Sequence, residues 1–340
     1  MKNKITIVGI NFWPEDTAIG LYTYQLANFY REQGLEVNVI TGFPYYPEWR
    51  INSEYRSKKT YYEESINGIK IYRFKQYVPK KPIFFKRILH LLHFTLGSFI
   101  NLFKIKKTDV VLCVVPFIGC VLIGKFLAKL KGAKLWVHIQ DFEFDAVRDS
   151  NLVDEKTDKN IIFRMLFYVE SKLLNSADLL STISFSMLKK LKGKTKIKIE
   201  KKLLPNWVDQ NFIVPEGHKK HSYLKSDKFK ILYSGNIGEK QDWDFFIKFA
   251  KELDKEKDIQ IIVVGNGSKR YWLEEKLLDL ENIWFYNPVA YSELSDLLCS
   301  ADLHILFQKV NLIDTVMPSK ILAMMASKRP SLITGSLKSE

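Results

Sequence analysis

The sequence predicts an α/β fold made of two domains, each built around a parallel sheet. Its 340 residues exceed what one compact core usually holds, and this length favours two domains of about 150 residues each. Short β-branched or apolar runs alternate with stretches of helical periodicity, which is the pattern of βαβ units. The alternation stops at a polar stretch and then begins again, so we expect a second unit of the same class.

The first domain is expected to contain a series of buried strands in chain order. They are residues 5–9, 37–41, 110–115, 134–138 and 179–184. Helical periodicity marks residues 21–33 and 163–175 between strands. Residues 110–124 are apolar throughout, but Pro116 and nearby glycines divide them into a strand, a turn and the start of a helix.

The second domain repeats this pattern. Its expected strands are residues 229–233, 259–264, 283–285 and 303–307, and a helix is expected over residues 321–326. Residues 204–208 and the polar stretch 215–228 carry little apolar periodicity, so we assign the linker to them. The domains are therefore expected to be residues 1–210 and 211–340.

Composition excludes several classes of protein. Hydrophobic residues make up 46% of the chain and charged residues 26%, values that a disordered or collagen-like protein does not show. Cys113, Cys120 and Cys299 form no CxxC pair, so we expect neither a disulfide framework nor a zinc site, in a reducing compartment. The apolar run near the N-terminus is too short for a signal peptide and predicts a first strand.

The charge balance predicts an anionic partner. The 52 Lys and Arg residues against 38 Asp and Glu give a net charge of +14. Such a charge attracts nucleic acid, an acidic membrane leaflet or phosphorylated small molecules. Composition does not choose among these partners, and lysine-rich surfaces are often merely solvated.

Residues 80–107 break the α/β pattern, because their centre is rich in Phe and Leu and their ends are basic. The apolar stretch 88–103 is about 16 residues long, shorter than the ~20 that a helix needs to cross a bilayer. A helix lying among lipid headgroups, with its lysines over anionic lipid, fits this composition. A buried helix with solvated lysines fits it as well, and both interpretations stay open here.

Glycine-bearing turns follow the first expected strand of each domain. The first turn ends in Gly20 before a helix and lacks the GxGxxG spacing of a nicotinamide site. Backbone N–H groups at such a helix start can approach a phosphate, although a connecting turn without a ligand is the alternative. The second turn carries Gly235, Asn236, Gly238 and Lys240, a layout suited to holding a diphosphate.

Other candidate ligand residues lie at strand ends or helix starts. Gly265 begins a further glycine turn at the carboxyl edge of the second sheet, where doubly wound sheets bind ligands. Lys320 follows Ser319 at a helix start and is expected to form an anion site. Asp242 and Asp244 match a DxD metal pair in letters, but they fall in a first helical turn, where acids complement the helix dipole.

His138 and Asp141 lie just past an expected strand of the first domain. Such positions face the crevice of an open α/β sheet, although a lone histidine is also commonly a hydrogen-bonded core residue. Asp141, Glu143 and Asp145 alternate along the chain, which suits either cation binding or a solvated strand edge.

Several motifs follow one another along nearly the whole chain. They are Trp13-Pro14-Glu15 with Gly20, and the stretches 138–145, 205–209, 233–241 and 314–320. In this order they resemble the family 4 retaining glycosyltransferases, and especially their bacterial colanic-acid and O-antigen branch. The resemblance implies the GT-B fold, in which two Rossmann-like domains face an interdomain cleft. The first domain would then lie on the acceptor side and the second would bind the nucleotide-sugar.

The resemblance also implies roles for single residues. Catalytic roles fall to His138, which would hydrogen-bond the transferred sugar, to Lys240 and to Asp314. The implied donor-binding residues are Gly20, Gly235, Asn236, Gly238, Lys240, Gly265, Ser319 and Lys320, and the implied acceptor-side residues are Trp13, Glu15 and Asp141. In such enzymes, retention of the sugar's anomeric configuration is attributed to front-face attack, in which the leaving phosphate takes the acceptor proton. No cofactor and no metal are then required, so protein cations must stabilise the departing diphosphate.

The sequence departs from the family pattern in three respects. Asn236 stands where many members have Arg. The family's E-x7-E pair falls on Thr315 and Ala323, with Asp314 one residue out of register. The chain also ends soon after residue 335, where family members continue, so the second domain is expected to be short.

The predicted function is transfer of a sugar from a UDP- or GDP-sugar to a lipid-linked or saccharide acceptor in capsule, O-antigen or exopolysaccharide biosynthesis. The protein is expected in the cytoplasm, peripheral at the inner face of the plasma membrane, with residues 80–107 on anionic lipid and no nucleic-acid partner. The missing glutamates leave a second hypothesis, a catalytically inactive GT-B partner subunit. Only the net charge supports a nucleic-acid-binding protein, since no RNP, KH or helix-turn-helix pattern is present.

Overall fold

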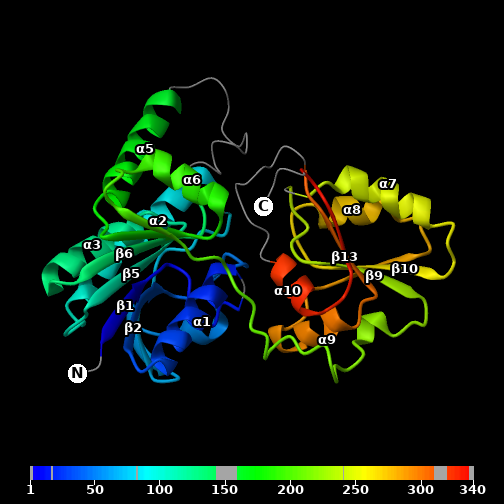
Figure 1. The fold of residues 1–340 in the computed structure, drawn as a ribbon, viewed down its shortest axis with the longest axis horizontal. Helices are drawn as coiled ribbons and strands as arrows, with labels where there is room; N and C mark the ends of the chain where they lie inside the picture. The colour runs from blue at the N-terminus through cyan, green and yellow to red at the C-terminus, as the bar shows by residue number, and fades with distance from the viewer. Residues whose placement is uncertain are drawn as a thin grey trace. The chain divides into compact units, whose positions relative to one another are not determined.

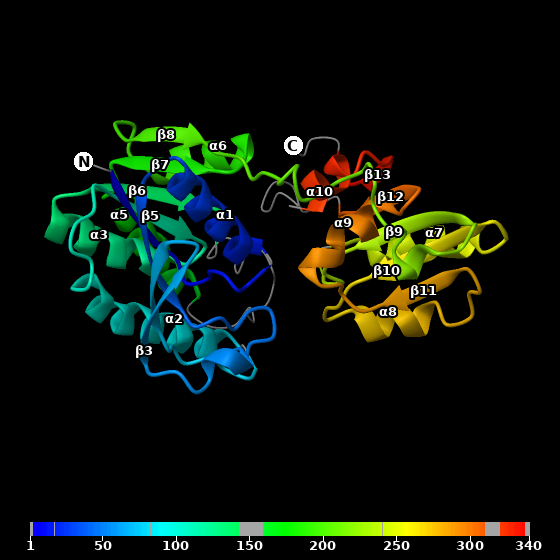
Figure 2. The ribbon, with the colours of Figure 1, turned by 90° about the horizontal axis from the view of Figure 1, so that it is seen from below.

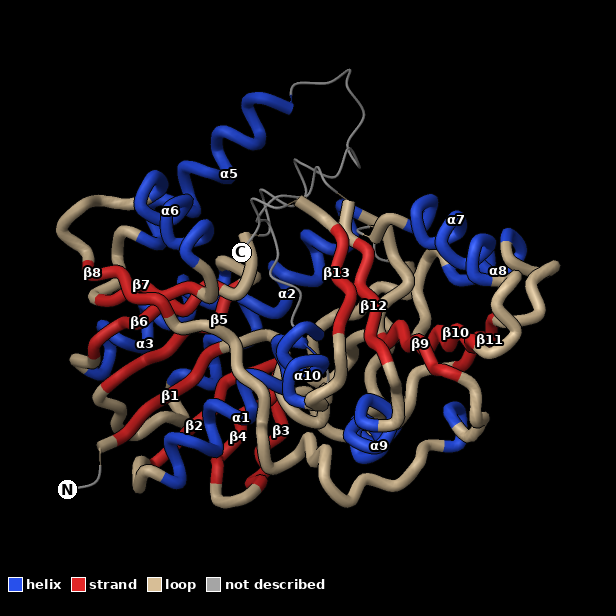
Figure 3. The backbone as a smooth tube through the Cα atoms, turned by 45° about the vertical axis from the view of Figure 1, so that its right-hand side comes forward, coloured by secondary structure: helices blue, strands red, loops and turns tan. Residues whose placement is uncertain are grey.

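The computed structural model describes residues 3–16, 18–81, 83–142, 159–239, 241–309 and 320–336. It forms two compact units, Met1–Pro205 and Asn206–Glu340, which divide close to the expected boundary at residue 210. In each unit helices surround a sheet of mainly parallel strands, which confirms the α/β class (Figure 1). Figure 3 shows the strands of each unit gathered into one sheet.

The sheet of the first unit has the strand order β3-β4-β2-β1-β5-β6-β7-β8. The strands are β1 Lys4–Val8, β2 Glu36–Gly42, β3 Tyr61–Ile66, β4 Ile69–Phe74, β5 Val110–Val115, β6 Lys134–Ile139, β7 Leu179–Thr182 and β8 Glu200–Leu203. All of these pairs are parallel except the β3–β4 hairpin. The sequence pattern did not predict β3, β4 and β8, because each of these strands carries charged side chains that are exposed to solvent.

Helices cover both faces of this sheet. Among the described residues they are α1 Ala18–Glu32, α2 Phe84–Leu102, α3 Gly119–Lys131, α5 Lys159–Leu174 and α6 Phe185–Lys194. The chain moves in one direction from β1 to β2 and in the other from β5 to β6, so right-handed crossovers place α1 and α3 on opposite faces. α2 packs beside α3, as Figure 2 shows.

The carboxyl ends of β1 and β5 form the switch point of the first sheet, where doubly wound sheets bind ligands. Val8 of β1 lies opposite Ile40 of β2 and Cys113 of β5. His138 is paired in register inside β6, which continues through Ile139, one residue beyond the expected strand end at residue 138.

The sheet of the second unit has the strand order β11-β10-β9-β12-β13. The strands are β9 Phe229–Ser234, β10 Ile259–Val264, β11 Ile283–Tyr286, β12 Leu303–Phe307 and β13 Ser331–Thr334, and the helices are α7 Trp243–Leu253, α8 Arg270–Lys276, α9 Leu294–Cys299 and α10 Lys320–Ala326. The strand order reverses between β9 and β12, so their carboxyl ends form the switch point of this unit.

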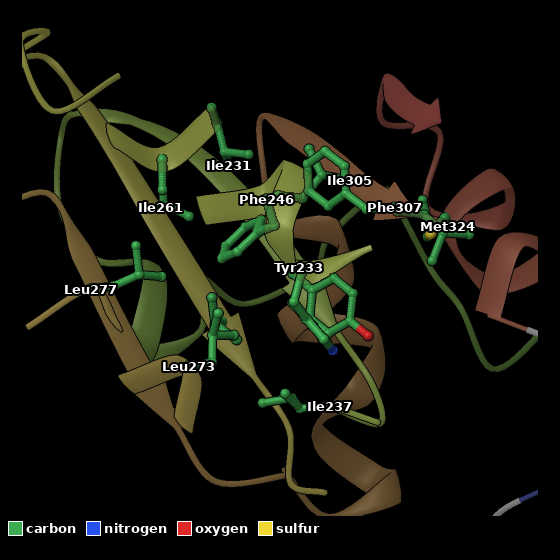
Figure 4. Packing of buried hydrophobic residues seen from close by; sticks show 14 residues of the cluster. Ile231, Tyr233, Ile237, Phe246, Ile261, Leu273, Leu277, Ile305, Phe307 and Met324 are labelled. Carbon is green, nitrogen blue, oxygen red and sulfur yellow. The ribbon is translucent and has the colours of Figure 1, made fainter. Parts of the chain in front are cut away.

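The core of the second unit lies on both faces of β9. Ile231 and Tyr233 pack with Phe246 of α7 and Leu273 of α8, as Figure 4 shows. Leu232 belongs to a separate cluster that includes α9. Because both faces are buried, the centre of β9 is the apolar run Ile231–Tyr233, and the end of the strand places the following glycine turn at the switch point.

The stretch 215–228 is part of the second unit, so its assignment to the linker was wrong. The Lys219 N–H donates to the Asp296 carboxylate at 2.9 Å, and the His221 N–H donates to the Ser300 hydroxyl at 2.9 Å. Backbone hydrogen bonds hold this stretch in place, and apolar periodicity does not reveal them. Among the described residues, no helix has both the length and the apolar character that crossing a bilayer requires.

Candidate active site

The glycine turn after β9 is held by backbone hydrogen bonds to the turn after β10. The Gly235 N–H donates to the Val264 carbonyl at 2.9 Å, and the Ile237 N–H donates to the Asn266 carbonyl at 2.9 Å. Gly235 has a φ of 140°, a value that residues with a side chain rarely adopt. The two turns therefore form one structure at the switch point.

Close contacts explain the glycines of the two turns. A Cβ on Gly265 would lie 1.9 Å from the Gly235 carbonyl oxygen, and one on Gly238 would lie 3.0 Å from the Asn236 side-chain nitrogen. A Cβ on Gly267 would lie 2.5 Å from the Asn236 Oδ1. The structure thus brings together four predicted donor-site residues, namely Gly235, Asn236, Gly238 and Gly265.

Lys320 reaches the same turn from the start of α10. Its Nζ donates to the Tyr233 hydroxyl at 2.9 Å and lies 4.4 Å from the centre of the Tyr233 ring. A Cβ on Gly235 would lie 2.8 Å from this Nζ, so glycine leaves room for the ammonium group. The Tyr233 hydroxyl donates in turn to the Asn236 carbonyl at 2.7 Å.

The Lys320 ammonium group has no acidic partner among the described residues. Burial lowers its pKa from 10.5 to about 8. Two other described cations near the turn are paired, since Lys269 lies 3.2 Å from Glu239 and Arg270 lies 2.8 Å from Glu274. A cation without a carboxylate beside a glycine turn is suited to binding an anionic ligand.

Asp242 and Asp244, the two acids of the DxD match, lie at the start of α7, as expected. Asp242 is the N-cap of α7, and its carboxylate accepts the Phe245 N–H at 3.1 Å. Within the part of the chain that the structure describes, no group of three or more His, Cys, Asp or Glu side chains could hold a metal ion.

His138 is buried in the first unit, and both of its ring nitrogens have partners. Nδ1 lies 2.9 Å from the Ser181 hydroxyl, and Nε2 lies 2.9 Å from the Gln140 amide nitrogen. The Trp136 indole N–H donates to the same hydroxyl at 2.7 Å. Burial lowers the pKa of His138 to about 4, so the ring is neutral at pH 7. Contact with a sugar therefore requires Gln140 to release Nε2.

The expected role of His138 can be separated from a structural one. We expect His138→Ala to weaken sugar transfer roughly 10-fold or more, the scale of one lost substrate hydrogen bond with a buried partner. The Kd of the free nucleoside diphosphate should stay within twofold. Ser181→Ala removes the Nδ1 partner but keeps the ring, and it should lower the Tm without the same loss of transfer. Equal losses of transfer and of nucleotide binding in His138→Ala would make the residue structural.

Gly20 lies in the first turn of α1 and does not end a loop. The helix begins at Ala18, earlier than the expected start at residue 21. A Cβ on Gly20 would lie 2.7 Å from the Glu15 carbonyl oxygen, so the helix start packs directly on the preceding loop. Glycine is disfavoured inside helices, so the sequence pattern placed Gly20 at the end of the loop and did not reveal this close approach.

The three residues expected on the acceptor side belong to loops that follow β1 and β6. Glu15 is buried, and Trp13 stacks on Tyr24 of α1 with ring centres 4.9 Å apart. Asp141 is partly buried directly after β6. Lys240, Asp314 and Ser319 lie outside the described residues, as do Glu143, Asp145 and Thr315. Ala323 packs against the apolar cluster of α9, at the position of the family's second glutamate.

Sequence reasoning missed the residues that support the predicted ones. Tyr233 was expected at the end of an apolar strand and in the motif stretch 233–241, but the contact of its hydroxyl with Lys320 was not predicted. Arg270 donates from Nη1 to the carbonyls of Gly265 and Tyr286, and Gln140 and Ser181 hold His138. No sequence signal pointed to Arg270 or Ser181.

Comparison with known proteins agrees with this geometry. The family model described as "Glycosyl transferases group 1" matches residues 228–339. The colanic acid biosynthesis glycosyl transferase WcaI of Escherichia coli (strain K12) is 34% identical over 350 residues, which cover 99% of this chain and 84% of that protein. The chain belongs to the group 1 glycosyl transferases.

Solved structures show that this glycosyltransferase has the GT-B fold. Sucrose-phosphate synthase from Thermosynechococcus elongatus has a TM-score of 0.70 at 13% identity and covers 99% of this chain and 83% of its own. Anabaena Alr3699/HepE in complex with UDP and glucose has a TM-score of 0.62 at 13% identity, covering 97% of this chain and 80% of its own. The expected family and fold are therefore confirmed.

Proposed function

We propose that this glycosyltransferase transfers a sugar from a UDP- or GDP-sugar to a lipid-linked or saccharide acceptor in the biosynthesis of a surface polysaccharide. The second unit would bind the donor and the first unit the acceptor. The name of WcaI, which refers to colanic acid biosynthesis, and the UDP and glucose in the HepE structure support these substrate classes.

The Lys320 ammonium group at the Gly235 turn is the observation that carries this proposal. A donor diphosphate would supply the negative charge that the described residues do not offer to Lys320. Two opposite charges at about 4 Å attract by about 4 kcal/mol at an effective dielectric constant near 20. The same charge would also stabilise the nucleoside diphosphate as it leaves.

A screen of UDP, GDP and their sugar derivatives for thermal stabilisation tests this function. A ligand at 100 times its Kd adds about 2.7 kcal/mol, which raises the Tm by several degrees. Donor consumption with and without acceptor is then measured for each stabilising compound. If no compound stabilises the protein, the donor assignment fails. Stabilisation without hydrolysis or transfer would instead support the inactive partner subunit.

We also propose that the reaction retains the anomeric configuration and needs no metal ion. In the mechanism that the family resemblance implies, the bond from sugar to phosphate breaks while the acceptor oxygen attacks the same face. The acceptor proton passes to the leaving phosphate. Use of Asp242 as a helix cap supports the absence of a DxD metal site.

Addition of a chelator is therefore expected to change turnover by less than twofold. The measurement compares transfer rates before and after treatment with EDTA, with added magnesium or manganese as the reference. Activity that EDTA abolishes and either ion restores would contradict a metal-independent reaction.

The exposed face of α2 supports a peripheral location at the inner face of the plasma membrane. One helical stripe carries exposed apolar side chains at i+3 and i+4 spacing, and α3 adds two more beside it. The α2 residues are Phe85, Leu89, Leu92, Leu96, Ile100 and Phe103, and the α3 residues are Phe126 and Leu130. The rings of Phe99 and Phe126 lie 5.2 Å apart and join the two helices. The outer side of α2 is exposed and has lysines at both ends. The interpretation of residues 80–107 as a buried helix therefore does not hold for this side.

A double substitution on this stripe, Leu96→Glu with Phe103→Glu, is expected to abolish binding to vesicles that contain anionic lipid. Each basic residue near such a surface contributes about 1 kcal/mol, so binding should also fall with salt and with neutral lipid. Met165→Glu on α5 is the control, because Met165 is comparably exposed and is not among the residues of this stripe. Equal co-sedimentation with neutral vesicles would refute the electrostatic part, and no co-sedimentation of the unmodified protein would refute membrane binding.

A further inference from the structure

A buried carboxylate joins two loops of the first unit. Glu15 is 4% exposed, and its Oε1 accepts the N–H groups of Tyr45 and Tyr46 at 2.8 and 2.9 Å. Its Oε2 accepts the side-chain amide of Asn11 at 2.8 Å. Glu15 follows β1, and the two tyrosines follow the neighbouring strand β2. One side chain thus ties together the loops at two adjacent strand ends, next to the switch point.

A second buried charge holds the same loop from β4. The Arg73 guanidinium is inaccessible to solvent and donates to the carbonyls of Trp13 and Gly42. It also forms an ion pair with Glu64. Gln76 holds the start of the loop after β2, because it accepts the Phe43 N–H at 2.8 Å and donates to the Phe43 carbonyl at 2.9 Å. The part of this loop that depends on Glu15 therefore begins at Tyr45.

The loop after β2 also packs on α2. The Tyr45 ring lies 4.7 Å and the Trp49 ring 5.7 Å from the centre of the His90 ring. The Arg87 guanidinium lies 5.5 Å from the centre of the Trp49 ring. This loop therefore lies between the loop after β1 and the helix whose outer face we propose to contact the membrane.

The charge on Glu15 is unfavourable to bury. Despite its hydrogen bonds, desolvation raises the pKa of this carboxyl from 4.5 to about 7. A neutral or apolar contact could join two loops at lower cost, since buried charges often contribute little net stability. Buried groups of this kind gather where geometry serves binding or catalysis.

We propose that Glu15 is a positioning residue for the acceptor saccharide, because its carboxylate sets residues 45–50 against the loop after β1, next to the switch point of the first sheet. This inference rests on the proposed function. Glu15 is not a catalytic residue, because its oxygens are turned to protein groups and are covered. Its effect on transfer is exerted through the Tyr45–Tyr46 backbone.

The test compares Glu15→Ala and Glu15→Gln with the unmodified enzyme, using the stabilising nucleotide-sugar as donor and a panel of methyl glycosides and polyprenyl-diphosphate-linked monosaccharides as acceptors. Hydrolysis of the donor by water, without acceptor, is the internal reference. Glu15→Ala is expected to raise the acceptor KM at least 10-fold, with donor hydrolysis and nucleotide Kd within twofold. Glu15→Gln keeps an oxygen for the two backbone N–H groups, so its acceptor KM should stay close to that of the unmodified enzyme.

Asp178→Asn is the matched control. The Asp178 carboxylate also accepts a backbone N–H, that of Leu135 at 2.8 Å, but it lies at the amino end of β6 and β7. This variant should leave the acceptor KM unchanged. Amide hydrogen exchange gives a second readout, in which the Tyr45 and Tyr46 amides exchange at least 10-fold faster in Glu15→Ala only.

Several results would overturn the inference. Equal losses of transfer and hydrolysis in Glu15→Ala, an unchanged acceptor KM, or the same change in Asp178→Asn would each give Glu15 a general structural role. If Glu15→Ala does not fold, Glu15→Gln supplies the test. Faster exchange of the Tyr45 and Tyr46 amides in Glu15→Gln with an unchanged acceptor KM would refute the inference. An unmodified enzyme that transfers sugar to no acceptor would refute the proposed function itself.

Discussion

Replacing Lys320 by methionine is expected to reduce turnover at least 100-fold and to weaken nucleoside diphosphate binding, while raising the Tm. Turnover is expected to fall because one preorganised charge at a developing anion typically accelerates a reaction on this scale. The Tm is expected to rise because the buried ammonium group beside Tyr233 has no acidic partner among the described residues. A residue whose removal stabilises the fold but ends the activity serves the ligand.

The gain in stability should depend on pH in a defined direction. The folded-state pKa of Lys320 is about 8, below the value of 10.5 for an exposed lysine. The unfolded chain therefore holds this proton more tightly, and the lysine destabilises the fold by about 3 kcal/mol below pH 8. The penalty disappears as the pH rises from about 8 to 10.5. The difference in Tm between Lys320→Met and the unmodified protein should shrink over the same interval.

Lys251→Met is the control, because Lys251 is an exposed cation in the last turn of α7. Calorimetric unfolding and turnover are measured on both variants and on the unmodified protein. Full activity in Lys320→Met, or a lower Tm at pH 7, would remove Lys320 from the donor site.

Replacing Arg73 by methionine is expected to destabilise the first unit by about 3–5 kcal/mol, the usual result of removing one partner of a buried ion pair. Glu64 would lose its cation, and the Trp13 and Gly42 carbonyls would lose their donors. Arg73→Lys should restore little stability, because an ammonium group cannot reproduce the planar fork that serves three acceptors.

Lys70→Met provides the comparison on the same strand. Lys70 is exposed and lies 3.7 Å from Glu36, so its loss should change the free energy of unfolding by less than about 1 kcal/mol. Urea unfolding followed by circular dichroism measures all three variants. Equal stabilities of Arg73→Met and Lys70→Met would show that the loop after β1 does not depend on the buried guanidinium.

The sequence predicted most of the sheet strands because their residues are buried on both faces. β5 is a continuous apolar run, and β10 and β12 are apolar except for Gln260 and His304; the structure places all three strands at the expected residues. Edge strands such as β3 and β8 present polar side chains to solvent, so their composition resembles that of a loop. The stretch 215–228 was misjudged for a related reason, because its place depends on backbone hydrogen bonds to Asp296 and Ser300.

The candidate site was predictable only where single residues have a local signature. Gly235 and Gly265 stand out because a positive φ or a backbone contact requires glycine there. The contact between Lys320 and Tyr233 joins residues that are far apart in the sequence, and only the packing of α10 on the sheet reveals it. The ties of Glu15 to Tyr45 and Tyr46 are likewise set by the pairing of β1 with β2.

Proton uptake on nucleotide binding tests the central claim, that Lys320 binds the donor diphosphate, most directly. Calorimetric titration of UDP and GDP at pH 8, in buffers that differ in ionisation enthalpy, measures the protons taken up per ligand bound. Because Lys320 titrates at about pH 8 and a diphosphate would keep it protonated, we expect an uptake of about half a proton. Lys320→Arg should bind nucleotide without this uptake. An uptake of zero in the unmodified protein, or the same uptake in Lys320→Arg, would contradict the assignment.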